Sequence, residues 1–380
     1  MAQVQPITSS REFDPVQIAD ELGKRFAAAE TRDEDLFVAD NINALKEAGL
    51  VEAGVPRELG GGGASHAELA EMLRVLGRYC GSTALAFSMH THQVAIPAWR
   101  WTHQKFAGAE PLLRRIANER IILLSSGGSD WITGSGKAEK VDGGYRINAR
   151  KVFTSGAPLG NLLMTSAVWE SDEGPMVIHF GLPMNSPHVK VLDTWRTLGM
   201  RGTGSHDVLI EGHVVPDAAV AMTRKAGQWH PAFQIIATLA FPLVYSVYLG
   251  IAESARDIAV GLAKKRHADR NVLSLVGQMD TSLRAAQLAR NDMLAVVARS
   301  NPSAESINEV MIGRHLVERN AIRTVELAME AAGGAGFYRA QGLERRFRDI
   351  QAARYHPLQS GPQAEYAGAM ALGLPIDKIF

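Results

Sequence analysis

A short turn rich in glycine and serine contains the residue types best suited to hold a charged or flat ligand. It follows the apolar run 121–124 and reads Ser-Ser-Gly-Gly-Ser-Asp over residues 125–130. Glycine lets main-chain N–H groups approach an anion closely, and no bulky side chain here keeps a ligand off the backbone. The turn therefore indicates a site for a phosphate group or a flat ring, although a Gly-Ser loop alone is a weak phosphate signal.

Two histidines, His90 and His92, stand near the middle of a small, apolar stretch that is predicted to be a helix over 81–101. Imidazole can take up or release a proton near neutral pH, so both are candidates for acid–base chemistry. Residues two apart lie about 200° apart around a helix, so the two side chains cannot both face one site squarely. A structural role in the core or at an interface is the alternative for either histidine.

The elements that must position these groups follow from the spacing of apolar residues. Period-two alternation in 144–148 and 161–169, bounded by Gly, Pro and Asp, predicts an antiparallel β region. Residues 11 to about 119 show helical spacing, with Ser65 and Glu68 placed as a capping box. Helices are also predicted over 233–263, 274–300, 302–332 and 363–372, the third beginning with Asn301 as cap and Pro302 as first residue. Four such helices favour an antiparallel bundle.

Composition excludes several classes of partner. The chain has 380 residues, 46% of them hydrophobic, and a formal net charge of zero, so neither nucleic acid nor an anionic membrane is an expected partner. No run of about 18 apolar residues is expected to span a bilayer, and residues 1–10 lack the pattern of a signal peptide. A single cysteine, Cys80, excludes an internal disulfide and a cysteine metal cluster. We expect a cytoplasmic protein without a bound metal.

The order and spacing of several short motifs resemble the acyl-CoA dehydrogenase superfamily over nearly the whole chain. These motifs are Gly-Gly-Ser-Asp at 127–130, Lys-Val-Phe-Thr-Ser-Gly at 151–156, and Leu-Gly-Met-Arg-Gly-Thr-Gly-Ser at 198–205, running into Val-Val-Pro at 214–216. The resemblance implies an α+β fold with an N-terminal helical domain (1–119), a central antiparallel β-barrel or sandwich domain (120–223) and a C-terminal four-helix bundle (224–380). It also implies a homotetramer whose flavin sites are shared between subunits.

The resemblance assigns flavin contacts to named positions. Phe153 stands where the family usually has a tryptophan on the flavin ring, and Ser155 stands where a hydroxyl meets N5. Ser125 and Ser126 fall at the pyrimidine edge. The pyrophosphate turn corresponds to Gly128 and Ser129, in a loop about two residues shorter than is usual in the family.

A second set of flavin contacts is implied at the subunit interface. Arg266 corresponds to an arginine that meets the cofactor's diphosphate from the partner chain, and Gly333 with Gly334 resembles the loop near the adenosine end. Two acidic departures, Asp269 and Glu330, are unfavourable near a diphosphate by Coulomb repulsion. We therefore expect FAD to be held loosely, or FMN to be used instead.

The catalytic base of a dehydrogenase is missing from both positions where the family carries it. The glutamate expected after the Arg348-Asp349 pair is His356, and the alternative position on the first helix after the β region is Ala240. The residues are closer to the two-component monooxygenase branch, whose members take reduced flavin from a separate reductase and use O₂. Members of that branch resemble this chain in a histidine after the Arg-Asp pair, a histidine on the cavity-floor helix and a serine near N5. Imidazole can donate and relay a proton in a site that excludes water.

Three functions remain open at this point. The favoured one is a monooxygenase of a small, largely apolar substrate, with His356, His92 or His90, and Ser155 as catalytic candidates and a flavin reductase as indirect partner. The alternatives are an acyl-CoA dehydrogenase with an unusual base and a catalytically degenerate flavin-binding protein. For His356 itself the alternative is a structural histidine that caps the Arg348-Asp349 turn.

Overall fold

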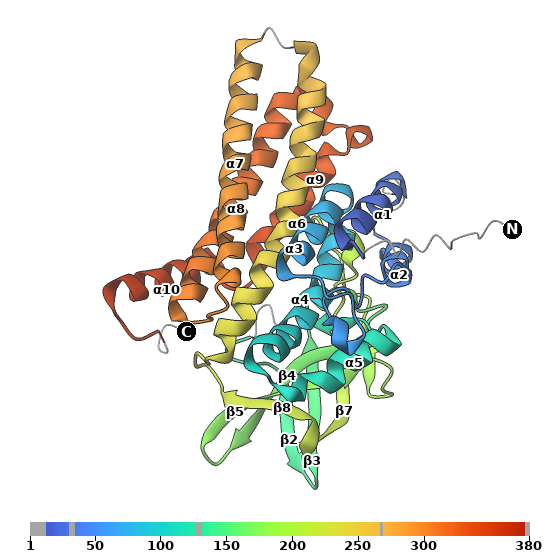
Figure 1. Cartoon of the computed structure of the whole chain (residues 1–380), viewed down its shortest axis with the longest axis vertical. Coiled ribbons are helices and arrows are strands. Elements are labelled where there is room, and N and C mark those ends of the chain that lie inside the picture. Colours follow the sequence, from blue (N-terminus) through green and yellow to red (C-terminus); the bar gives the residue numbers. More distant parts are fainter. Residues whose placement is uncertain (1–12, 30–34, 127–130, 267–268, 377–380) are drawn as a thin grey trace, which may run out of the picture.

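The fold consists of helices, then a sheet, then longer helices, in chain order (Figure 1). The computed structural model describes residues 13–29, 35–126, 131–266 and 269–376. The helices of the first part are α1 (Pro15–Ala29), α2 (Ala39–Glu47), α3 (His66–Tyr79), α4 (Gly81–Gln104) and α5 (Glu110–Glu119). The fold class expected from the sequence is confirmed, and the arrangement places α4 against both the sheet and the C-terminal helices.

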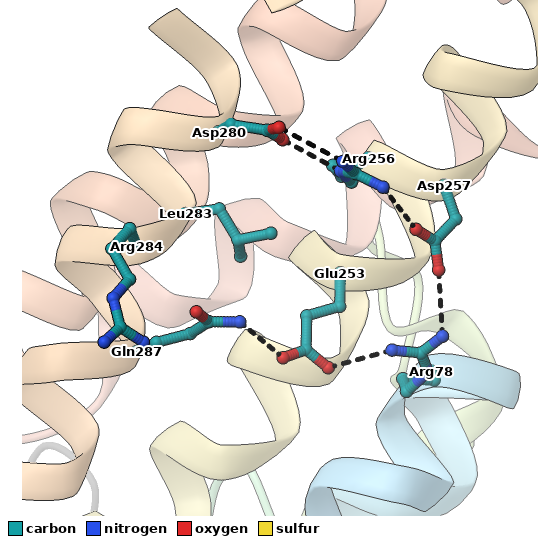
Figure 2. A pocket seen from close by; sticks show the side chains of 8 residues that line it. All are labelled: Arg78, Glu253, Arg256, Asp257, Asp280, Leu283, Arg284 and Gln287. Atoms are coloured by element: carbon teal, nitrogen blue, oxygen red, sulfur yellow. Dashed lines mark hydrogen bonds and ion pairs between the residues drawn. The ribbon is translucent and has the colours of Figure 1, made fainter. Parts of the chain in front are cut away.

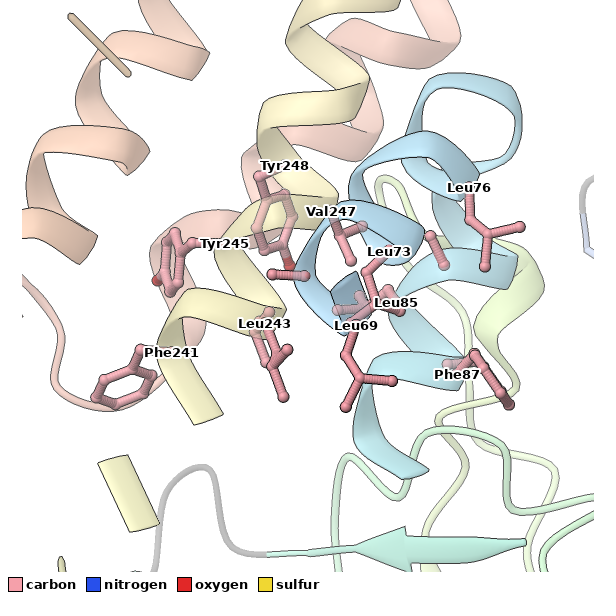
Figure 3. Close-up of a cluster of buried hydrophobic side chains, with 14 of the residues drawn as sticks. Leu69, Leu73, Leu76, Leu85, Phe87, Phe241, Leu243, Tyr245, Val247 and Tyr248 are labelled. Carbon is pink, nitrogen blue, oxygen red and sulfur yellow. The ribbon is translucent and has the colours of Figure 1, made fainter. Parts of the chain in front are cut away.

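Helix α3 begins at the capping box that the sequence predicts. The Ser65 side chain accepts from the Glu68 backbone N–H, and the Glu68 carboxylate accepts from the Ser65 N–H at 2.7 Å. The apolar side of α3 packs on α6, and a Cβ at Gly77 would lie only 2.5 Å from the Val247 carbonyl oxygen. Figure 3 shows α3 leucines such as Leu73 beside Val247. A glycine is therefore what allows these two helix backbones to approach so closely.

The sheet of the middle part is mixed. Its strands are β1 (Leu123–Ser125), β2 (Lys137–Val141), β3 (Gly144–Lys151), β4 (Leu162–Ser171), β5 (Gly174–Pro183), β6 (Val189–Val191), β7 (Val208–Pro216) and β8 (Val220–Lys225). They lie in the order β6-β7-β3-β2-β4-β5-β8, with β1 on β4. Both β1 and β2 run parallel to β4, whereas the sequence predicted an antiparallel domain. Period-two alternation shows which face of the sheet a residue occupies, but it does not show whether the neighbouring strand runs parallel or antiparallel. The parallel pairing could therefore not be predicted from this pattern.

The C-terminal part is a helical bundle, as expected. Its helices are α6 (Ala232–Ala263), α7 (Arg270–Ala298), α8 (Ala304–Ala332), α9 (Leu343–Ile350) and α10 (Ser360–Leu372). Helix α9 was not predicted, because it has only eight residues and most of them are charged. Helix α8 begins at Ala304, two residues later than predicted, because Ser303 caps it in a capping box with Ser306.

Helix α6 corrects the expectation that no stretch is apolar enough to span a membrane. By length and composition alone it passes that test, and 89% of its apolar window is buried inside the protein. Burial on several sides explains the composition, because α6 packs against α3, α4, α7, α8 and α9. It is therefore read as a core helix.

The loop around Met200 is tied to α9 across a long stretch of chain. The Asp349 carboxylate accepts from the Met200 backbone N–H at 2.5 Å. A Cβ at Gly199 would lie 2.2 Å from the Arg348 carbonyl oxygen, so the loop approaches α9 as closely as a backbone can. The Arg348-Asp349 pair thus anchors the Leu-Gly-Met-Arg loop of the β region.

Candidate active site

The segment that follows α9 is held against the bundle through its backbone. The Tyr245 hydroxyl donates to the Ala353 carbonyl at 2.8 Å. Arg314 Nη2 donates to the His356 carbonyl at 2.9 Å and also lies 3.4 Å from that of Ala353. Tyr245 and Arg314 have no exposed surface. Two helices, α6 and α8, therefore fix where the backbone of His356 lies.

The ring of His356 is held by a second tyrosine of α6. Its Nε2 lies 2.6 Å from the Tyr248 hydroxyl oxygen. Burial lowers the pKa of His356 to about 3, helped by the positive charge of Arg314 and by His92. The imidazole is therefore neutral at neutral pH. It does not cap the Arg348-Asp349 turn, because its ring bonds to Tyr248 instead.

His92 is a second neutral imidazole within electrostatic reach of His356. Its Nδ1 lies 2.9 Å from the Ser88 carbonyl oxygen, and its Nε2 lies 3.3 Å from the Gln93 amide nitrogen. A carbonyl only accepts, so Nδ1 carries the hydrogen and Nε2 presents a lone pair. Burial lowers the pKa of His92 to about 4. His92 Nε2 thus accepts a long hydrogen bond from Gln93, and a ligand donor would share or displace that amide.

Both ring nitrogens of His90 bond to backbone groups, which favours the structural alternative for this histidine. Its Nε2 donates to the Val51 carbonyl at 2.8 Å, and its Nδ1 accepts from the Leu123 backbone N–H at 3.0 Å. Both ring nitrogens are occupied by backbone groups, and burial lowers the pKa of His90 to about 4. The helical spacing anticipated this separation, because it turns the two histidines to different sides of α4. His92 is therefore the stronger candidate on that helix.

Ser155 belongs to a chain of buried hydroxyl groups. Its Oγ lies 2.8 Å from Ser205 Oγ, which lies 2.6 Å from Thr203 Oγ1. Thr203 in turn donates to the Met200 carbonyl at 2.8 Å. Because each hydroxyl has one hydrogen, Ser205 donates to Thr203 and Ser155 donates to Ser205, so Ser155 Oγ presents lone pairs on its free side. Sequence reasoning missed Ser205 and Thr203, although both lie in the 198–205 motif on which the resemblance rests.

Phe153 presents an aromatic face to solvent on a constrained backbone. Its side chain is 54% exposed and packs edge-on against Trp195, with ring centroids 5.5 Å apart. Its φ of 55° lies in the left-handed region, which is uncommon for a bulky residue. A conformation of this kind persists where the surrounding structure holds it, often at a ligand site.

The serines of the Gly-Ser turn lie at the end of β1. The Ser126 hydroxyl is 2.7 Å from that of Thr165, and the Ser125 hydroxyl is 3.5 Å from Met89 Sδ on α4. Both serines are half-buried. Gly128 and Ser129, predicted to hold a pyrophosphate, lie outside the described residues.

The residues expected at the subunit interface cluster where α7 and α8 meet their loops. Arg266 donates to the Ala331 carbonyl, and its guanidinium would lie about 3.5 Å from a Cβ at Gly333, whose φ is 60°. Next to it, Gly334 has open space around its Cβ position. Asp269 departs from the family for a local reason, because its carboxylate caps α7 by accepting from Asn271 N at 2.8 Å.

Neither customary position of a catalytic carboxylate holds one. Ala240 and its neighbour Phe241 are buried on α6, and His356 occupies the other position. A buried carboxylate does occur nearby on α8, where Glu318 pairs with Arg314 at 3.0 Å and burial raises its pKa. Sequence reasoning missed this pair and Tyr248. The signal was an Arg and a Glu four residues apart in a long helix.

A charged crevice lies elsewhere on the helices. Its volume is about 360 Å³, and it is lined by Arg78, Glu253, Arg256, Asp257, Asp280, Leu283, Arg284 and Gln287. Figure 2 shows how the acids and arginines alternate, with Arg78 bridging Glu253 and Asp257, and Arg256 bridging Asp257 and Asp280. None of the candidate active-site residues lines this crevice. It lacks the apolar faces that a flavin ring requires.

The candidate site, by contrast, fits a flavin. The exposed ring of Phe153 offers an apolar face, and the oriented hydroxyl of Ser155 lies two residues further along the same loop. Ser125 and Ser126 add hydroxyl and backbone groups at the end of β1. Together they form a set of hydrogen-bond donors and acceptors of the kind that a flat ring with a polar edge needs.

The chain belongs to the acyl-CoA dehydrogenase superfamily. The model of the acyl-CoA dehydrogenase N-terminal domain matches residues 17–106, and that of the C-terminal domain matches residues 243–360. Together the two matches cover more than half of the chain and include α4, which carries His92, and the segment that carries His356.

Individual relatives give more detail than the two domain models do. An amino sugar nitrososynthase of Streptomyces peucetius is 28% identical over 91% of this chain and 90% of its own length. A dibenzothiophene monooxygenase of Mycolicibacterium goodii is 25% identical over 92% of this chain and 91% of its own. The solved structure of KijD3 with FMN and a dTDP-linked 3-amino sugar superposes with a TM-score of 0.87 at 26% identity, covering 98% of this chain and 96% of that one.

Proposed function

We propose that the protein is a flavin-dependent monooxygenase that uses reduced flavin and O₂ on a small substrate. The observation that carries the proposal is His356, a neutral imidazole where a dehydrogenase of the superfamily has its glutamate, held by Tyr248 and within electrostatic reach of His92. The known activities of two relatives, oxygenation of dibenzothiophene and nitroso formation on amino sugars, support an oxidative role.

Reduced flavin, when bound, supplies the two electrons with which one oxygen atom of O₂ enters the substrate while the other leaves as water. The protein's own residues would hold and orient the flavin. Phe153 offers a face for the ring, and Ser155 offers a hydroxyl whose direction is set by Ser205. His356 supplies a neutral N–H or lone pair, and His92 supplies a lone pair at Nε2. Neutral groups in a dry site can move a proton without first breaking an ion pair.

The cofactor is proposed to be FMN or FAD, delivered in reduced form by a separate reductase, and the protein is proposed to act in the cytoplasm. Asp269 and Glu330 support loose retention of FAD, since acidic groups are unfavourable near its diphosphate. The substrate is proposed to be largely apolar, because buried side chains near the candidates, such as Ala240 and Phe241, offer no charge.

The test is to replace His356 by alanine and supply reduced FMN with O₂, using dibenzothiophene and a dTDP-linked amino sugar as probes. Reduced-flavin affinity should stay nearly unchanged, whereas oxygenated product per flavin falls and hydrogen peroxide rises. A positioned acid–base group typically contributes about 10²- to 10⁴-fold, so the loss should be large. The matched control is His103→Ala, which removes an exposed histidine from the same helix as His92.

The opposing result is equally specific. Flavin bleached anaerobically by any acyl-CoA thioester, with no reductase present, would favour a dehydrogenase and overturn the proposal. A wild-type protein that binds reduced flavin but oxygenates neither probe nor an apolar panel would favour a degenerate flavin-binding protein.

We also propose that the protein is a homotetramer. Apolar side chains are exposed along α7 and α8, among them Leu273 at 57%, Leu288 at 53% and Leu316 at 41%. Exposed apolar side chains that gather on long helices are a common feature of subunit interfaces. Light scattering at micromolar concentration should give four times the 41.1 kDa chain mass, and a monomer would contradict the proposal.

A further inference from the structure

The Tyr248 hydroxyl has one hydrogen-bond partner within the described ranges, His356 Nε2 at 2.6 Å. The tyrosine ring has no exposed surface and lies three residues after Tyr245 on α6 (Figure 3), so both reach the segment after α9 from the same helix. Their targets differ. Tyr245 bonds to the backbone at Ala353, whereas Tyr248 bonds to the imidazole itself.

The charges of the two partners decide which atom carries the hydrogen. Burial raises the pKa of Tyr248 well above 10 and lowers that of His356 to about 3, so both groups are neutral at neutral pH. Between a neutral phenol and a neutral imidazole, the phenol is the stronger acid and the ring nitrogen is the stronger base. The hydroxyl therefore donates to Nε2. The single N–H of the imidazole must then be on Nδ1.

The other contacts of His356 leave this choice to Tyr248. Arg314 donates to the His356 carbonyl and fixes the backbone, but this bond does not determine which ring nitrogen carries the hydrogen. Within the part of the chain that the structure describes, Nδ1 has no protein partner. The ring nitrogens point in different directions, so an Nδ1 hydrogen is directed away from Tyr248.

We propose that Tyr248 is a positioning residue that locks His356 in the Nδ1–H tautomer and so presents a fixed neutral N–H donor to the site. His92 has the complementary role, because its Nδ1–H donates to the Ser88 carbonyl and its Nε2 is an acceptor. The site then holds one imidazole that donates and one that accepts. The catalytic meaning of this arrangement rests on the proposed monooxygenase function, but the tautomer itself does not.

The first experiment reads the tautomer directly. Full-length protein labelled with ¹⁵N-histidine is compared by NMR with His356→Gln, which identifies the His356 signals. We expect the wild-type pattern of a protonated Nδ1 and an accepting Nε2. In Tyr248→Phe, which keeps the buried ring, this pattern should be lost or mixed with the other tautomer. A protonated Nε2 in the wild type, or an unchanged pattern in Tyr248→Phe, would overturn the inference.

Tyr245→Phe is the matched control for a merely structural effect. It removes one buried hydroxyl from the same helix, one turn away, and loosens the same segment. We expect it to lower the melting temperature about as much as Tyr248→Phe does, yet to keep the Nδ1–H pattern. If both variants lose the pattern equally, the tautomer follows from the segment's rigidity and the inference fails.

The second experiment measures coupling with reduced FMN, O₂ and the two probes. Tyr248→Phe should bind reduced FMN as the wild type does. The product formed per flavin should fall by about three- to tenfold, which corresponds to the loss of one neutral hydrogen bond, and hydrogen peroxide should rise in proportion. Unchanged coupling would overturn the positioning role. A wild type with the Nδ1–H pattern but no oxygenation of any probe would contradict the proposed function while the tautomer assignment stands.

Discussion

Two charged regions of the helical part differ in what surrounds them. Arg314 is fully buried and Glu318 nearly so, and the arginine also donates to carbonyls after α9. In the crevice of Figure 2, Arg256 and Asp280 form a two-point pair at 2.8 and 3.1 Å, but their side chains are 33% and 46% exposed. The same kind of ion pair thus occurs both in the core and at the surface.

The comparison teaches that the number of ion pairs says little about what they do. In the crevice, water replaces a lost partner at small cost. In the core, a lost partner leaves a charge and several carbonyls without compensation. Only the buried pair is connected to the segment that carries His356, so only it should matter for the candidate site.

The largest effect is expected from Arg314→Met. Removing one partner of a buried pair costs about 3–5 kcal/mol, because Glu318 is left unpaired in a dry environment. Urea unfolding followed by circular dichroism should show this loss in the free energy of unfolding. The double variant Arg314→Met, Glu318→Leu should recover much of it. A single-variant loss under about 1 kcal/mol would place Arg314 with the surface pairs and break the comparison.

The second prediction concerns how the free energy of unfolding depends on pH in the two regions. Burial lowers the pKa of His66, His90 and His92 to about 4 and that of His356 to about 3. The unfolded chain, with histidine near 6.5, binds more protons below that pH, so stability should fall as pH drops from 7 to 5. Each buried histidine contributes up to about 1.4 kcal/mol per pH unit.

Urea unfolding at pH 7, 6 and 5 measures this slope. His92→Gln should reduce the slope by about one proton. Carboxylates and guanidinium groups ordinarily titrate outside this window, so the crevice should contribute little. A stability that is flat from pH 7 to 5 would show that the histidines are not held neutral by burial.

The smallest effect is expected from Asp280→Asn in the crevice. A pair exposed to this degree contributes less than about 1 kcal/mol, and the contribution should shrink further in high salt. The same urea titration, at low and high salt, measures it. A loss above about 2 kcal/mol would mean that the crevice pairs act as a core network, and the contrast with Arg314 would disappear.

Local patterns in the sequence predicted most of the elements and several of their ends. The capping box at Ser65 was readable because its two residues are three apart, and the close of α8 at Gly333 followed from glycine's access to positive φ. The start of α8 was misplaced, because Asn301-Pro302 and Ser303 are both acceptable starts. The choice depends on Ser306, whose side chain completes the box with Ser303.

The candidate site was predictable in its members but not in its contacts. His92 and His356 are 264 positions apart in the sequence, and no spacing rule connects them. Tyr248 and Arg314 looked like ordinary members of two long helices, since a buried polar group is recognised only by its partner. The backbone contacts of His90 were unpredictable for the same reason. Its partners are the Val51 carbonyl and the Leu123 N–H. Because these are backbone atoms, the residue types in the sequence do not indicate the contacts.

The contact between Asp349 and Met200 has a consequence for the order in which the protein is made. The β region is synthesised well before α9, but its 198–205 loop gains the Asp349 carboxylate only when a residue 149 positions later has emerged. Domains generally fold from the N-terminus during synthesis. The hydroxyl chain behind Ser155, which ends on the Met200 carbonyl, is therefore assembled before the carboxylate that braces it arrives. The carboxylate that braces this loop therefore comes from the same stretch of chain that brings in His356.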